Sequence, residues 1–154
     1  MTDDRPRAAG ARTIPTHGSC HCGGVEFEVL LGSSVLITLC TCGICFMSGH
    51  QEILVPEEEF TLLRGADHLK PYRFGVRIAD HTFCVVCGIM PFYRPRSHPE
   101  GFFSVNARCL DLSGVSERTY VEFDGRDWEA SMAANSHRTN VDPMAADDSM
   151  MRRG

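Results

Sequence analysis

The hexapeptide Cys40-Thr41-Cys42-Gly43-Ile44-Cys45 carries three thiols within six residues. A zinc ion takes four protein ligands in a structural site, but three ligands and an open position in a reactive site. Three thiols crowded at one point of the chain therefore predict a reactive zinc site. In such a site Cys40, Cys42 and Cys45 leave one coordination position free for water or a substrate.

Two pairs of thiols flank this hexapeptide, with the short spacings typical of zinc knuckles. Cys20 and Cys22 precede it, Cys84 and Cys87 follow it, and a glycine comes directly after each pair. The two pairs together supply the four ligands of a closed zinc site. One zinc ion shared between them would clamp distant parts of the chain and so stabilise the fold. We therefore expect two zinc ions per chain, one structural and one reactive.

The same residues allow other ligand sets. The central cluster would become a second closed site if His50 or Cys109 supplied a fourth ligand. His21 and His81 could substitute as ligands in the outer site, although four thiols already complete it. Without such a role, Cys109 is the small apolar side chain that a lone cysteine usually is.

The bulk composition is that of one globular domain. The chain has 154 residues, of which 43% are hydrophobic and 23% charged, and a formal net charge of −5. An acidic balance argues against nucleic-acid binding, which needs a concentrated basic surface. No apolar run approaches the roughly 20 residues of a membrane span, and the first residues lack the apolar segment of a signal peptide. We therefore expect a cytoplasmic protein whose eight cysteines serve as metal ligands rather than disulfides.

Short apolar–polar alternations, separated by glycine and proline, predict an all-β domain. The segment Val25-Glu26-Phe27-Glu28-Val29 alternates with period two, which is typical of a strand with one buried face. The expected strands are 25–29, 35–39, 52–55, 60–64, 72–74, 81–84, 102–105 and 118–123.

The helical signal is weak throughout the chain. Residues 46–50 are expected to form a loop, and no convincing helical period precedes Trp128. We expect a flexible lead-in over 1–14, a zinc-binding domain over 15–129 and a loose tail over 130–154.

The cysteine-containing segments resemble the motifs of a known family. The stretches GSCHCGG (18–24), CTCGIC (40–45) and FCVVCG (83–88) resemble, in this order, the glutathione-dependent formaldehyde-activating enzyme family, which includes centromere protein V. The resemblance covers about 17–128. Three further stretches look like the centromere protein V branch in particular: FYRPRS (92–97), VNARCLD (105–111) and FDGRDW (123–128).

This resemblance implies a β-tent fold of several small coiled antiparallel sheets tied by zinc. It also implies a carbon–sulfur lyase, in which formaldehyde and glutathione are reversibly joined into S-(hydroxymethyl)glutathione. The partner would be a small thiol, with glutathione as substrate or ligand. The implied metal ligands are Cys20, Cys22, Cys84 and Cys87 for the structural zinc, and Cys40, Cys42 and Cys45 for the reactive, catalytic zinc.

Glutathione carries two carboxylates, and arginine binds carboxylates through paired hydrogen bonds. Arg94 and Arg96 flank Pro95 shortly after the second thiol pair, and Arg108 directly precedes Cys109. We therefore take Arg94, Arg96 and Arg108 as candidate contacts to glutathione.

Two other functions are compatible with parts of this pattern. One is a non-catalytic zinc β-tent module, either a glutathione carrier or a protein-binding domain. The other is a methionine-R-sulfoxide reductase, a zinc-bearing relative in fold, in which Cys109 would be the nucleophile. That family usually uses two Cys-x-x-Cys pairs for one zinc and has no use for a Cys-x-Cys-x-x-Cys cluster, so it fits less well.

Overall fold

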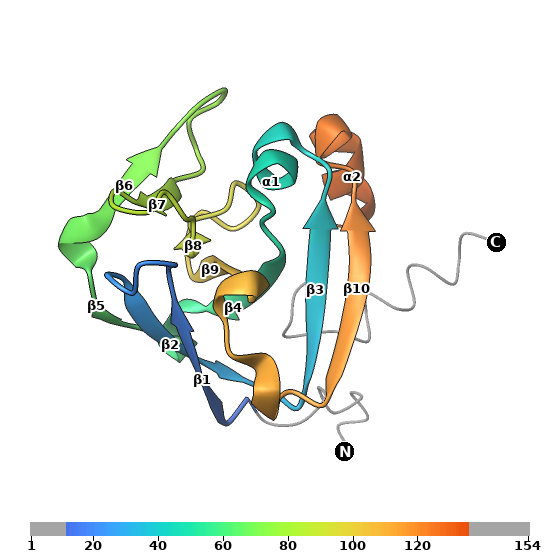
Figure 1. The fold of residues 1–154 in the computed structure, drawn as a ribbon. Coiled ribbons are helices and arrows are strands. Elements are labelled where there is room, and N and C mark those ends of the chain that lie inside the picture. Colours follow the sequence, from blue (N-terminus) through green and yellow to red (C-terminus); the bar gives the residue numbers. More distant parts are fainter. Residues whose placement is uncertain (1–11, 136–154) are drawn as a thin grey trace, which may run out of the picture.

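The computed structural model describes residues 12–135, and in this part of the chain the strands form three small sheets. The expected all-β architecture of small sheets is therefore confirmed (Figure 1). The first sheet holds β1 (Ile14–Ser19), β2 (Glu26–Leu31) and β5 (Phe60–Arg64), in that order. The second holds, in order, β10 (Glu117–Phe123), β3 (Ser34–Cys40), β4 (Glu52–Pro56), β9 (Phe102–Asn106) and β8 (Phe92–Tyr93). The third pairs β6 (Leu69–Tyr72) with β7 (His81–Cys84).

Strand β2 shows how the alternation in the sequence becomes a core. Phe27, Val29 and Leu31 are buried on one face, whereas Glu26, Glu28 and Leu30, which alternate with them, are only half-buried. Phe27 stacks on Phe60 of β5, with ring centroids 5.6 Å apart, and meets Phe92 edge to face at 5.2 Å. These aromatic contacts join the first sheet to the second and form the centre of the molecule.

Strands β3 and β10 run parallel, whereas every other strand pairing in residues 12–135 is antiparallel. The sequence led us to expect antiparallel sheets, so the parallel pairing of β3 with β10 differs from that expectation. A parallel pair needs a long crossover, and most of the domain lies between these two strands. Their carboxyl ends meet at one edge, with Cys40 opposite Phe123 (Figure 1).

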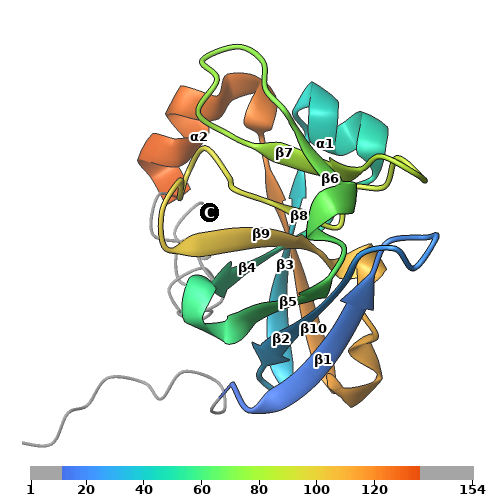
Figure 2. The same ribbon diagram turned by 90° about the vertical axis from the view of Figure 1, so that its left-hand side faces the viewer.

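Two helices lie beyond that edge, α1 (Gly43–Ser48) after β3 and α2 (Trp128–Asn135) after β10, as both ribbon views show (Figure 2). A loop was expected over 46–50, but α1 occupies part of it. The helical turn places Cys42 and Cys45 three residues apart on one face, and the Phe46 amide donates to the Cys42 carbonyl at 2.9 Å.

Strand β1 was not expected, because Pro15 and Gly18 weaken its strand signal. Most of the expected lead-in and the tail beyond Asn135 lie outside the described residues. Within residues 12–135, no helix is long and apolar enough to cross a membrane.

Candidate metal centres

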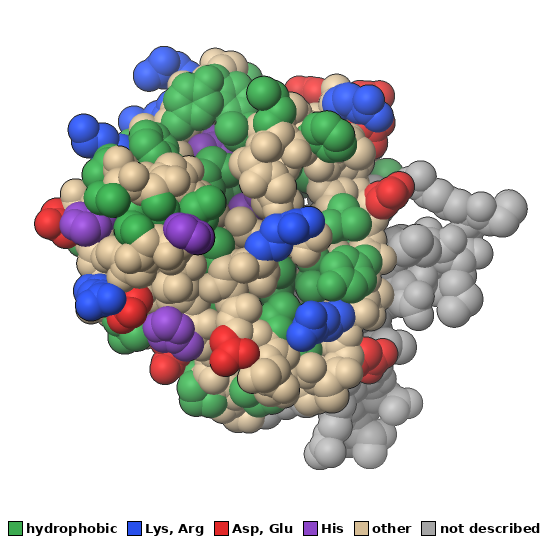
Figure 3. Space-filling model, viewed as in Figure 1, with side chains coloured by type: hydrophobic (Ala, Val, Ile, Leu, Met, Phe, Trp, Pro, Cys, Tyr) green, Lys and Arg blue, Asp and Glu red, His purple; other side chains and the backbone are tan. Residues whose placement is uncertain are grey.

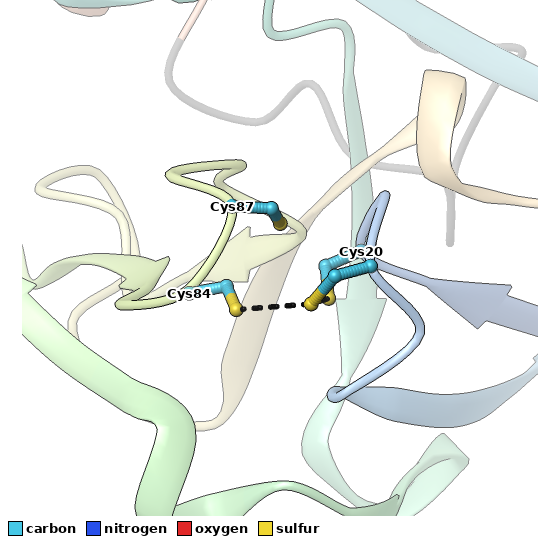
Figure 4. Close-up of side chains that lie close together, drawn as sticks. Cys20, Cys84 and Cys87 are labelled. Carbon is cyan, nitrogen blue, oxygen red and sulfur yellow. Dashed lines mark hydrogen bonds between the residues drawn. The ribbon is translucent and has the colours of Figure 1, made fainter.

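Four thiols from two separate turns converge at one end of β7. The sulfur atoms of Cys20, Cys22, Cys84 and Cys87 all lie within 4.8 Å of one another (Figure 4). The Cys22 Sγ is 3.5 Å from the Cys20 Sγ and 3.7 Å from the Cys84 Sγ. Four thiolates at the usual zinc–sulfur distance of about 2.3 Å would lie about 3.8 Å apart in a tetrahedron. The cluster therefore fits a closed zinc site. Its four members are the four cysteines that the sequence spacing predicted as structural ligands.

The turns around this cluster aim backbone amides at sulfur. The Gly24 amide donates to the Cys22 Sγ at 3.4 Å, and the Val25 amide donates to the Cys20 Sγ at 3.3 Å. Gly23 and Gly88 have φ angles of 73° and 77°, which side-chain-bearing residues rarely adopt. Hydrogen bonds from amides stabilise thiolates, so the turn that carries Cys20 and Cys22 is suited to hold ionised sulfur.

The second cluster joins the end of β3 to the first turn of α1. The sulfur atoms of Cys40, Cys42 and Cys45 lie within 4.8 Å of one another, and no other histidine, cysteine or carboxylate in residues 12–135 joins this group. Hydrogen bonds from Cys40 and Cys45 lower the pKa of the Cys42 thiol far below its ordinary value. Hydrogen bonds with Cys40 first, and with Cys42 next, raise the pKa of the Cys45 thiol. Three adjacent thiols cannot all ionise without a cation, because the thiolates would repel one another. A divalent cation would take the place of their protons.

The turn after β10 is hydrogen-bonded to the segment that carries the three thiols. The Thr41 amide donates to the Phe123 carbonyl at 3.0 Å, and the Thr41 hydroxyl donates to Asp124 Oδ1 at 2.7 Å. Residues far apart in the sequence therefore hold the three-thiol segment in place. A turn was expected at Asp124-Gly125, but its contact with the thiols could not be read from the sequence.

A cavity of about 220 Å³ opens beside the three thiols. Its lining includes Cys40, Cys42 and Cys45, together with His50 and His81. Burial lowers the pKa of His50 to about 3, so this imidazole is neutral at physiological pH.

The buried His50 ring does not complete the thiol cluster. Its Nε2 atom lies 2.9 Å from the Ser104 hydroxyl oxygen, and its Nδ1 atom has no hydrogen-bond partner among the described residues. The three-thiol cluster is therefore an open set of ligands.

The half-buried Glu52 and the buried Tyr93 add two polar groups to the cavity wall, and sequence reasoning missed both. Burial raises the pKa of the Glu52 carboxyl, while a hydrogen bond with Ser104 acts in the opposite direction. The Tyr93 hydroxyl lies 3.9 Å from the Cys45 Sγ, and burial raises its pKa. The sequence did contain a sign of Glu52, because a carboxylate directly precedes the apolar strand residues Ile53-Leu54-Val55.

Of the three arginines expected to contact glutathione, Arg96 lines the cavity. Its guanidinium carbon lies 3.6 Å from the Trp128 ring centroid, and its Nη2 lies 3.0 Å from Glu129 Oε1. Arg94 and Arg108 are not among the lining residues.

Arg94 pairs instead with Glu57 at 2.7 Å and lies over the Phe103 ring. Arg108 lies near Gly49, just after α1. The structure therefore does not bring the three arginines to one place.

The remaining candidates fall outside both clusters. His21 is exposed, and His81 lies in the cavity wall, where its ring stacks on Tyr93 at 4.5 Å. Cys109 is half-buried, burial raises its pKa to about 11, and it belongs to neither group of thiols.

Comparison with known proteins identifies a family and a solved structure to which this chain is similar. The family model described as "Glutathione-dependent formaldehyde-activating enzyme" matches residues 15–124, a range that contains all seven clustered thiols. A crystal structure of a Rhodobacter sphaeroides protein is 35% identical in sequence, with a TM-score of 0.56. That match covers 67% of this chain and 99% of the other chain.

Proposed function

The chain belongs to the glutathione-dependent formaldehyde-activating enzyme family, and on that premise we propose that it is a zinc-dependent carbon–sulfur lyase. Its substrate would be a glutathione adduct such as S-(hydroxymethyl)glutathione. The reaction breaks the bond between carbon and sulfur and releases an aldehyde and a thiol, or joins them in reverse.

The difference between the two thiol clusters carries this proposal. The four-thiol cluster offers a complete ligand set, whereas the three-thiol cluster offers an incomplete one at the wall of a cavity. A zinc ion bound by three thiolates supplies a Lewis-acidic position that stabilises the substrate sulfur as a thiolate. Cys40, Cys42 and Cys45 would hold that ion, and Cys20, Cys22, Cys84 and Cys87 would hold the structural ion.

Glu52 is positioned to move the proton that the reaction requires. In the cleavage direction the adduct hydroxyl loses its proton, the carbonyl double bond forms and the carbon–sulfur electron pair leaves with sulfur. Glu52 is the single carboxyl among the described residues that line the cavity. A carboxyl whose pKa is raised by desolvation can accept the proton and return it in the reverse direction. The apolar lining reduces the access of water to this exchange.

Replacement of zinc by Co²⁺ tests whether the substrate sulfur reaches the metal. Glutathione should strengthen the sulfur-to-metal absorption of the cobalt protein, because a fourth thiolate joins the site. S-methylglutathione, which has no ionisable thiol, is the matched control and should leave the spectrum unchanged.

Turnover separates an enzyme from a binding module. The lyase proposal requires both the spectral change and accelerated cleavage of S-(hydroxymethyl)glutathione. A spectral change without turnover would indicate a glutathione carrier instead. An unchanged spectrum at saturating glutathione would reject glutathione as the ligand.

A further inference from the structure

Part of the cavity wall is apolar. Trp128 and Met132 of α2 form one part of this wall, and Phe74 and Val76 of the β6–β7 connection form another. Both ribbon views place α2 and this connection at the same end of the molecule (Figure 2). Apolar side chains also gather on the surface over the β6–β7 connection (Figure 3).

Helix α2 lies beyond the segment that this chain shares with the family model. The match ends at residue 124, and α2 begins at Trp128. Arg96 fixes the start of the helix, because it stacks on Trp128 and pairs with Glu129. Trp128 closes the stretch FDGRDW, and Met132 lies about one helical turn further along α2.

Charged groups are scarce inside the cavity. Among the described lining residues, Arg96 is the one permanent cation and Glu52 is the one carboxyl. The Arg96 guanidinium is already engaged by Glu129. The two carboxylates and the ammonium group of glutathione would lose hydration against the apolar wall, so they belong outside the cavity. The part of the substrate that enters the cavity is therefore the reacting sulfur and the carbon atoms attached to it.

The volume is larger than a hydroxymethyl group requires. That group adds two heavy atoms to sulfur, comparable with two water molecules at about 30 Å³ each. An apolar cavity of about 150 Å³ in another protein holds benzene. The cavity here measures about 220 Å³, which is room for a six-membered ring beside the sulfur.

We infer that the cavity takes the thiohemiacetal of a bulky apolar aldehyde, aromatic or branched, with its substituent against Trp128 and Met132. The inference rests on the proposed function, since it assigns the substrate class of the same site. In the joining direction the thiolate sulfur bonds to the carbonyl carbon, the π electrons move to oxygen and oxygen takes one proton. No oxidant or reductant is needed.

Paired aldehydes test the substrate class with the zinc-loaded protein. The exchange of glutathione with phenylacetaldehyde and with formaldehyde is measured by NMR, each relative to its uncatalysed rate. We expect kcat/KM for phenylacetaldehyde to exceed that for formaldehyde by at least about tenfold, since a few apolar carbons in a fitted pocket give such ratios. A preference for formaldehyde would overturn the inference and leave the lyase proposal standing. Acceleration of neither exchange would overturn the lyase proposal itself.

A binding measurement tests the cavity without turnover. Trp128 is the sole tryptophan of the chain and lines the cavity, so its fluorescence reports on occupancy. The probe is 2-phenylethanol, which has the same apolar group as phenylacetaldehyde but no reactive carbonyl. We expect a saturable fluorescence change, and the absence of one would overturn the inference.

Variants locate the probe on the apolar wall. Met132→Glu should weaken 2-phenylethanol binding at least about tenfold. Ala133→Glu is the matched control, because Ala133 is exposed on the same helix and does not line the cavity. Val76→Asp is a second test on the opposite element, where 58% exposure makes the substitution tolerable to the fold. Equal affinity in Met132→Glu, Val76→Asp and Ala133→Glu would contradict the assignment of the wall.

Discussion

Gly125 lies so close to Cys40 that a Cβ atom at position 125 would stand 2.4 Å from the Cys40 Sγ. The same Cβ atom would lie 2.7 Å from the Cys42 Cβ. Neither distance is compatible with a real van der Waals contact. A glycine is therefore required where the turn after β10 crosses the three-thiol cluster, because only a chain without a side chain can approach so closely.

Gly125→Ala should displace Cys40 and weaken the three-thiol site while the four-thiol site stays intact. Overpacking of this kind costs about 1–3 kcal/mol, so the protein should still fold. Elemental analysis should then find zinc reduced from about two ions to about one per chain. Gly43→Ala is the matched control, because a Cβ atom at position 43 meets nothing within 4 Å. Equal zinc loss in both variants would contradict the contact between Gly125 and Cys40.

The gently purified wild-type protein should contain close to two zinc ions of unequal tightness. Four thiolates around a closed site release metal less readily than three thiolates beside a cavity. Mild chelation should therefore lower the zinc content toward one without loss of the far-ultraviolet circular dichroism of the folded state. A folded, stable protein that binds no metal at all would refute both metal centres.

Cys84→Ser and Cys42→Ser should differ in their effect on folding. Cys84 belongs to the four-thiol cluster that joins two distant turns, and structural zinc binding is coupled to folding. We expect its substitution to lower the free energy of unfolding by more than about 4 kcal/mol, a size typical of metal loss. Cys42→Ser should leave a folded protein with an altered three-thiol site. Equal losses of stability in chemical denaturation would mean that the division into structural and reactive sites is wrong.

Glu52→Gln should stabilise the protein at neutral pH relative to wild type. Burial raises the pKa of Glu52 in the folded state, so the folded state binds more protons than the unfolded state between the two pKa values. The stability of the wild type therefore falls as pH rises from the ordinary glutamate pKa, about 4.3, through the folded pKa. The difference between the two proteins should grow over this window, as measured by urea unfolding at a series of pH values. A difference that is independent of pH would exclude Glu52 as its source.

The same substitution should lower turnover of the thiol adduct by about 10²–10⁴-fold, the usual contribution of a general acid–base residue. Zinc content should not change, because Glu52 is not part of either thiol cluster. Glu122→Gln is the control, since Glu122 is exposed on β10. Undiminished turnover in Glu52→Gln would assign the proton transfer to another group.

Local patterns in the sequence predicted the features that depend on neighbouring residues. The thiol spacings predicted both clusters, and the alternation around Phe27 predicted β2. The parallel pairing of β3 with β10 could not be predicted, because nothing near Cys40 indicates that Phe123 will lie opposite it. The cavity wall has the same origin, since Trp128 follows β10 in the chain and comes to line the cavity beside the thiols when β10 pairs with β3.

The contact between the three-thiol segment and the turn after β10 also has a consequence for the synthesis of the protein. Thr41 and Asp124 are separated by 83 residues, and Cys22 and Cys84 by 62. Synthesis proceeds from the N-terminus at about 5–20 residues per second, so Cys40, Cys42 and Cys45 leave the ribosome seconds before the turn that covers them. The nascent chain thus carries three exposed metal-binding thiols before a cavity exists around them.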